Sequence, residues 1–111
     1  MSENSNSPAS IVLSTAGSPE EAARISHELV ERRLAACVNR VPGVTSVYRW
    51  QGAIEESAEV LLIIKTSAEK LPALEAALRE LHSYEVPEFL VLQVAAGSRS
   101  YLDWLLAAVE S

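Results

Sequence analysis

The stretch of residues 36–66 constrains the fold most strongly, because it has the composition of two long strands joined by a tight turn. Its first half has four valines together with Thr45, Tyr48 and Trp50, residue types that favour strands, and its second half contains the aliphatic run Val60–Ile64. Gln51 and Gly52 separate the two halves and are a turn candidate. Pro42 cannot donate to a sheet ladder, so we expect a bulge or bend there. This pattern predicts a long antiparallel hairpin.

Helix and strand patterns flank the hairpin on both sides. Ser18, Pro19 and Glu21 have the spacing of a helix start, with a capping serine, proline in the first turn and a capping box. Leucines three and four residues apart predict a second helix. In chain order we expect a strand at 10–16, a helix from 18, strands at 36–50 and 53–66, a helix from about 69 to 82, a strand at 89–95, and a helix at 101–109 capped by Ser100 or Asp103.

This order predicts an α+β fold of the ferredoxin-like, split βαβ type (βαββαβ) with a C-terminal helix. We expect one domain over residues 10–111 behind a disordered lead of residues 1–9. Two helices cover only one face of a four-stranded sheet, so the open face would show aliphatic residues together with Tyr48 and Trp50. A patch of that kind usually meets a partner, and the simplest partner is another copy of the chain.

Charge and cysteine content narrow the functional classes. Lysine and arginine number 9 against 15 acidic residues, which gives a net charge of −6. Neither a nucleic acid nor an anionic membrane surface is therefore an expected partner. The single cysteine cannot form a disulfide within the chain, and no secretory or membrane-spanning pattern is seen, so we expect a cytoplasmic protein. Known enzyme motifs are absent, which predicts that the protein is not an enzyme.

Five sequence blocks, in order, resemble the CutA family of divalent-cation tolerance proteins. They are LAACVN at 34–39, VPGVTSVYRWQG at 41–52, EVLLIIKT at 59–66, HSYEVPE at 82–88 and YLDWL at 101–105. The resemblance implies a ferredoxin-like trimer whose hairpin reaches onto neighbouring subunits, and a link to tolerance of copper and other divalent metals. Ser83 stands where the family usually has proline, and Leu81 where some relatives carry a second histidine. A paired-histidine copper site is therefore not available within one chain.

Cys37 and His82 are the candidate metal ligands, because copper favours thiolate and imidazole groups. We expect both near one end of the sheet. The alternative for Cys37 is a small buried apolar residue, and the alternative for His82 is a residue at a helix C-terminus.

A candidate ligand cleft between subunits brings together aromatic, acidic and basic side chains from several segments. Its expected members are Tyr48, Trp50, Lys65, Tyr84, Glu85 and Glu88. The alternative is structural, with Lys65 forming an ion pair with Glu85 or Glu88 at a subunit boundary.

These features favour a homotrimeric cytoplasmic protein that is linked to divalent metal tolerance and binds a metal or a small ligand. The expected cofactor is copper or another divalent cation, with no organic cofactor. One alternative is a structural trimer that serves an unknown protein partner without binding metal. Another is an unrecognised enzyme acting on a small molecule in the cleft.

Overall fold

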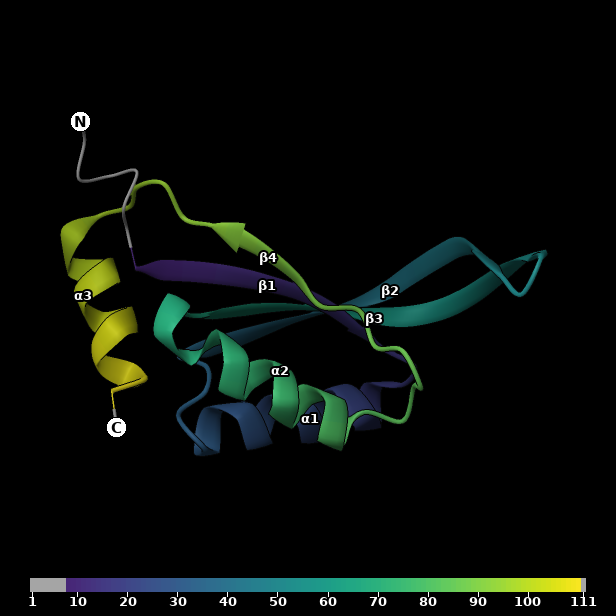
Figure 1. The fold of residues 1–111 in the computed structure, drawn as a ribbon, viewed down its shortest axis with the longest axis horizontal. Coiled ribbons are helices and arrows are strands. Elements are labelled where there is room, and N and C mark those ends of the chain that lie inside the picture. The colour runs from purple at the N-terminus through teal and green to yellow at the C-terminus, as the bar shows by residue number, and fades with distance from the viewer. Residues whose placement is uncertain (1–7, 111) are drawn as a thin grey trace.

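A computed structural model describes residues 8–110 and shows a four-stranded antiparallel sheet with two helices on one face (Figure 1). The strand order is β2-β3-β1-β4, as in the predicted split βαβ fold. The elements are β1 (Ala9–Ala16), α1 (Pro19–Glu31), β2 (Cys37–Trp50), β3 (Ala53–Ser67), the short 3-10 helix η2 (Ala68–Lys70), α2 (Leu71–Leu81), β4 (Leu90–Gln93) and α3 (Arg99–Ala108).

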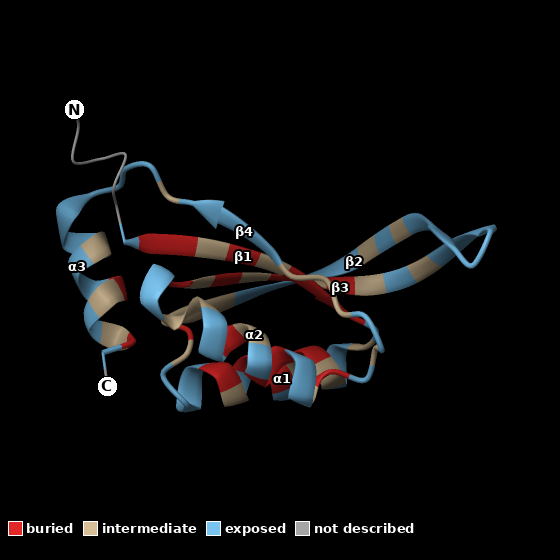
Figure 2. Ribbon diagram, viewed as in Figure 1, coloured by how far each residue is buried: buried red, intermediate tan, exposed pale blue. Residues whose placement is uncertain are grey.

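The core lies between the sheet and the helices α1 and α2, where the buried residues gather in Figure 2. Along β3, Val60, Leu62 and Ile64 are buried on the helix side, and the residues between them point to the other face. This alternation follows from the two-residue period of a strand. The aliphatic run therefore supplies both the core and half of the second face.

Helix ends follow local capping chemistry, with one difference from the prediction. The Ser18 Oγ atom accepts the Glu21 N–H at 3.1 Å, which starts α1 as expected. In α3 the cap is Ser98, whose Oγ accepts the Tyr101 N–H, so Ser100 and Asp103 are not caps. Ser98 has extended backbone angles, which an N-cap requires, whereas the helix already includes Ser100.

Strand β4 is shorter than the predicted 89–95 because it pairs only with the first half of β1. Its four residues face Ser10–Leu13. The pairing cannot continue past the start of β1 at Ala9, where Val94 makes a last backbone hydrogen bond at 3.2 Å. Of the predicted disordered lead, residues 1–7 lie outside the described part of the chain, and Ala9 itself is a buried strand residue.

The β2–β3 hairpin extends well beyond the helices (Figure 1). The predicted bulge lies between Val41 and Val44, and the turn consists of Gln51 and Gly52, both with positive φ. Such a two-residue turn matches the twist of long hairpin strands. The projection makes the molecule 45 Å long with a radius of gyration of 14.8 Å, against about 13 Å for a compact domain of this size.

The second sheet face has no covering layer from residues 8–110 over most of its length. Leu90 and Leu92 of β4 are about half exposed there, beside Leu13 of β1 and Leu61 and Ile63 of β3. Helix α3 lies at one end of the sheet in Figure 1. No helix of the described residues is long and apolar enough to cross a bilayer. The predicted open face is therefore present.

Candidate functional site

A cleft of about 640 Å³ lies under the projecting half of the hairpin. Its walls come from the end of β1, from both hairpin strands and from the loop after α2. The lining residues are Thr15, Ser46, Val47, Tyr48, Trp50, Glu59, Tyr84, Glu85, Val86, Pro87 and Glu88. The volume falls within the range of small-molecule sites.

His82 fixes the loop that forms one side of this cleft. It ends α2, and its side chain is fully buried. Its Nδ1 atom accepts the Tyr84 N–H at 3.0 Å, and its Nε2 atom donates to the Thr15 carbonyl at 2.6 Å. These two bonds select the neutral ring protonated on Nε2. Both ring nitrogens are therefore used to hold the loop against β1.

Glu21 holds the same loop from the start of α1. Its carboxylate is mostly buried and accepts the Ser83 N–H at 2.8 Å and the Gly17 N–H at 3.4 Å. Burial alone would raise the pKa of Glu21, but these hydrogen bonds outweigh it, so that its pKa lies below the ordinary value. The capping-box residue predicted from sequence thus also anchors the cleft loop.

Tyr84 connects the loop to β3. Its hydroxyl donates to the Glu59 Oε2 atom at 2.7 Å. Burial raises the pKa of Tyr84, and the bond to Glu59 adds to that shift, so the group is a protonated donor at neutral pH. The ring lies against Gly17, where a β-carbon would come within 3.0 Å of the hydroxyl oxygen. Glycine at this position allows Tyr84 to reach Glu59.

Three carboxylates line the cleft, and no lysine, arginine or histidine does. Burial raises the pKa of Glu88, and the nearby charge of Glu59 raises it further. Among residues 8–110, none of Glu59, Glu85 and Glu88 forms an ion pair. The site therefore has negative potential that its own residues do not balance.

Tyr48 and Trp50 form the aromatic side of the cleft. They alternate with Ser46 along β2, so all three share one face of the hairpin, as predicted. The Tyr48 hydroxyl lies 2.7 Å from the Ser57 hydroxyl on β3. Both rings remain more than two fifths exposed. Large apolar surface is thus offered to the cleft.

Lys65 does not line the cleft of its own chain. It faces Cys37 across the β2–β3 ladder, and its Nζ atom lies 5.8 Å from the centre of the Tyr101 ring of α3. Six strand residues, about 20 Å, separate it from Glu59. Lys65 is therefore too far from the cleft to pair with Glu85 or Glu88 of its own chain, and the expected pair across a subunit boundary stays a prediction. The other five predicted residues, Tyr48, Trp50, Tyr84, Glu85 and Glu88, do line the cleft.

Glu59 and Thr15 are cleft residues that the sequence analysis did not select. Glu59 lies directly before the aliphatic run of β3 and faces Val44 across the ladder. A polar residue on the hairpin face shared with Tyr48 and Trp50 is a usable signal, because side chains alternate along a strand. Nothing in the sequence marks Thr15, which reaches the cleft only because the loop folds back onto the end of β1.

The two candidate metal ligands lie at opposite ends of the sheet, so the expectation that they share an end was wrong. Cys37 faces Lys65, which pairs with Ile11, whereas His82 contacts Thr15. Four residues of β1, about 13 Å, separate these points. The crossing helices explain this, since α1 returns the chain to one end of the sheet and α2 to the other. Among residues 8–110, no group of three metal-ligating side chains is found.

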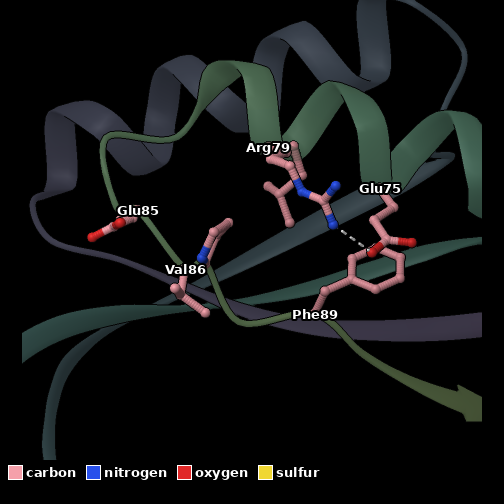
Figure 3. Close-up of a pocket in the computed structure, with 7 residues that line it drawn as sticks. Glu75, Arg79, Glu85, Val86 and Phe89 are labelled. Carbon is pink, nitrogen blue, oxygen red and sulfur yellow. Dashed lines mark hydrogen bonds and ion pairs between the residues drawn. The ribbon is translucent and has the colours of Figure 1, made fainter. Parts of the chain in front are cut away.

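A smaller cavity of about 270 Å³ lies on the other side of the same loop (Figure 3). Phe89, Val86 and Leu78 give it apolar walls. At its rim Arg79 pairs with Glu75 of the same helix at 2.9 Å. Glu85 also lines this cavity and has no ion-pair partner among residues 8–110, so this cavity too carries an unbalanced negative charge.

The split βαβ fold, projecting hairpin and cleft define a class of ferredoxin-like proteins with one open sheet face. Residues 10–108 match the family described as CutA1 divalent ion tolerance protein, and the chain belongs to that family. It is 53% identical over 95 residues to the divalent-cation tolerance protein CutA of Thermus thermophilus, covering 86% of this chain and 92% of that protein.

A mammalian relative and a solved structure agree with this assignment. Protein CutA of Mus musculus is 44% identical over 106 residues, which cover 94% of this chain but only 60% of the mouse protein. The crystal structure of CutA from Xylella fastidiosa superposes with a TM-score of 0.92 at 41% identity, covering 94% of this chain and all of that one. The family carries a link to divalent-cation tolerance.

Proposed function

We propose that the chain is a homotrimeric, cytoplasmic protein that acts in the response to divalent cations by binding rather than by catalysis. The open sheet face carries this proposal. Leu13, Leu61, Ile63, Leu90 and Leu92 form an apolar surface on the side away from the helices. A stable assembly of a small domain needs such a surface.

The hairpin supports assembly of more than two copies. It extends beyond the body of the domain, with Val47 and Ile54 about two thirds exposed near its tip. An isolated two-stranded ribbon with exposed apolar residues is at best marginally stable in water. Contact with a neighbouring subunit would cover it, and closed cyclic symmetry lets every copy make the same contact.

A metal shared between copies would use Cys37 rather than His82. Cys37 faces Lys65 on the open sheet face, where a second copy would lie, and its sulfur makes only a long contact of 3.9 Å to Asn39. Both nitrogens of His82 are already hydrogen-bonded. We therefore propose copper or another divalent cation as a transient, intersubunit ligand. The single cysteine also fits a reducing compartment.

The test is the mass of the full chain in solution, measured by light scattering over a range of micromolar concentrations. We expect three times the 12.0 kDa chain mass, and a monomer of 12.0 kDa would overturn the proposal. A trimer that binds no divalent cation in titration calorimetry would favour the structural scaffold. Turnover of a small molecule lost in a cleft variant would favour an enzyme.

A further inference from the structure

We propose that a second copy of the chain completes the cleft in the assembly, and that the Lys65 ammonium group of one copy forms an ion pair there with Glu88, beside Glu59, of the next. This inference rests on the proposed trimer and names the contact that joins its subunits. It is argued from the placement of charges on the open sheet face and from the symmetry of a closed ring.

Lys65 is the only basic residue in the four strands of the described chain that lies on the open sheet face. Arg40 pairs with Leu62 in the β2–β3 ladder, and Leu62 is buried on the helix side. Arg49 pairs with Ile54, an even-numbered position of β3 like Leu62, so it also points away from the open face. Strands β1 and β4 contain no lysine or arginine. The sheet of one copy can therefore offer its neighbour a single cation on this face.

The carboxylates of the cleft lie at the other end of the same face. Glu59 and Lys65 are both odd-numbered residues of β3, so their side chains point to one side of the sheet, about 20 Å apart. Glu88 lines the cleft beside Glu59. The apolar residues Leu61 and Ile63 lie between the two charged ends. Each chain thus has an apolar face with a positive end and a negative end.

Neither end has an opposite charge within its own chain. Among residues 8–110, neither Lys65 nor Glu88 forms an ion pair, and the Lys65 Nζ atom lies 5.8 Å from the centre of the Tyr101 ring. Lost solvation and the charge of Glu59 raise the pKa of Glu88. A subunit packed on the open face would remove water from both ends, and a buried charge is tolerated only when it is paired. The assembly must therefore supply partners for both groups.

Charge complementarity decides which ends of two neighbouring copies meet. Packing like ends together would set lysine against lysine and carboxylate against carboxylate, whereas packing unlike ends together pairs them. In a closed ring of three copies, each contact joins one patch of a chain to a different patch of the next. One lysine and one cleft in each chain therefore give three equivalent pairs.

Charge reversal in the full chain tests this pair. Lys65→Glu and Glu88→Lys should each lose the trimer at micromolar concentrations at which the wild type keeps it, because like charges then face each other. The variant with both substitutions should regain the trimer, since its two charges are only exchanged. Arg79→Glu reverses an exposed charge on α2 and should remain trimeric. Light scattering measures the mass of each variant, and circular dichroism its fold.

A disulfide tests the same contact without relying on the stability of the charge variants. Lys65→Cys and Glu88→Cys are combined in a Cys37→Ser chain, because Cys37 faces position 65 across the ladder and would compete for it. A disulfide needs Cα atoms within about 7 Å, and positions 65 and 88 of one chain lie at opposite ends of the sheet. We expect mild oxidation to give covalent dimers and trimers on a non-reducing gel. Each chain with one of the two cysteines should stay at 12.0 kDa.

Two results would overturn the inference. One is a doubly reversed variant that is no more trimeric than either single variant. The other is a trimer in which cysteines at positions 65 and 88 form no bond between chains. Both leave the proposed function intact as long as the wild type is a trimer, whereas a monomeric wild type overturns the proposed assembly itself.

Discussion

At the residue scale, a small polar network determines the shape of the cleft. His82 joins the loop to β1, Glu21 joins it to the start of α1, and Tyr84 joins it to β3. Each of these groups is wholly or mostly buried and has lost hydrogen bonds to water on folding. The hydrogen bonds within the protein replace them. Losing one partner would leave the other without a hydrogen bond, which costs about 1–3 kcal/mol.

Glu21→Gln should lower the free energy of unfolding by about 1–2 kcal/mol at pH 7, because two N–H groups lose a charged acceptor. The pKa of Glu21 is lowered in the folded state. Its contribution is therefore present above the ordinary value of 4.5 and is lost as the pH falls through the folded pKa. The difference in the free energy of unfolding between wild type and variant should shrink between about pH 5 and about pH 3, the range in which carboxyl groups usually titrate.

Urea unfolding at fixed protein concentration measures this difference. Glu20→Gln is the matched control, since Glu20 is exposed in the same first turn of α1. An equal loss of stability for both variants, or a difference that grows at low pH, would contradict the role given to Glu21.

Copper binding should distinguish the two candidate ligands. We expect Cys37→Ser to abolish most Cu(I) binding under reducing conditions, because the thiolate is the soft ligand on the open face. His82→Ala should leave the stoichiometry unchanged but lower the melting temperature, since it removes two buried hydrogen bonds. Calorimetric titration of both variants and the wild type measures this. If His82→Ala keeps its fold but binds fewer copper ions per chain than the wild type, the histidine is a ligand.

At the scale of elements, the hairpin depends on its turn and on its bulge. Gln51 and Gly52 both take positive φ, and Gly43 in the bulge does so too. Only glycine enters this region without a steric cost. The bulge shifts the register between Val41 and Val44 and thereby sets which side chains of β2 face the cleft.

Gly52→Ala should destabilise the protein by about 1 kcal/mol through backbone strain alone. Its φ is +84°, and a β-carbon there would meet no atom within 4 Å. Gly52→Asn should cost less, because asparagine tolerates the left-handed region. Thermal unfolding of both variants checks the order. If alanine and asparagine cost the same, side-chain contacts rather than backbone strain would set the stability of the turn.

At the scale of the whole molecule, the unequal covering of the sheet decides how the chain behaves in solution. One face packs on α1 and α2, where the buried residues gather (Figure 2), and on the other face Leu90 and Leu92 are about half exposed. The elongated shape places the hairpin where a neighbouring subunit can reach it. Stability and assembly should therefore be coupled.

Leu92→Glu should convert the assembly to monomers, because it places a charge on the open face at the edge strand β4, where Leu92 is about half exposed in a single chain. The wild-type melting temperature should rise with protein concentration, and that of the variant should not. Light scattering and calorimetry at several concentrations measure both. Val30→Glu, on the solvent side of α1, is the control and should remain trimeric. A trimeric Leu92→Glu would place the interface elsewhere.

The sequence alone determined the order of the elements, the bulge, the capping of α1 and the uncovered sheet face, because each depends on neighbouring residues and on the period of a strand or helix. It also predicted five residues of the cleft, since they belong to two short segments. The tertiary structure alone decided that Lys65 lies far from them, that Cys37 and His82 lie at opposite ends of the sheet, and that Glu59 and Thr15 complete the cleft. These are distances between residues far apart in the chain. They depend on the direction in which each crossing helix returns to the sheet, which no local pattern records.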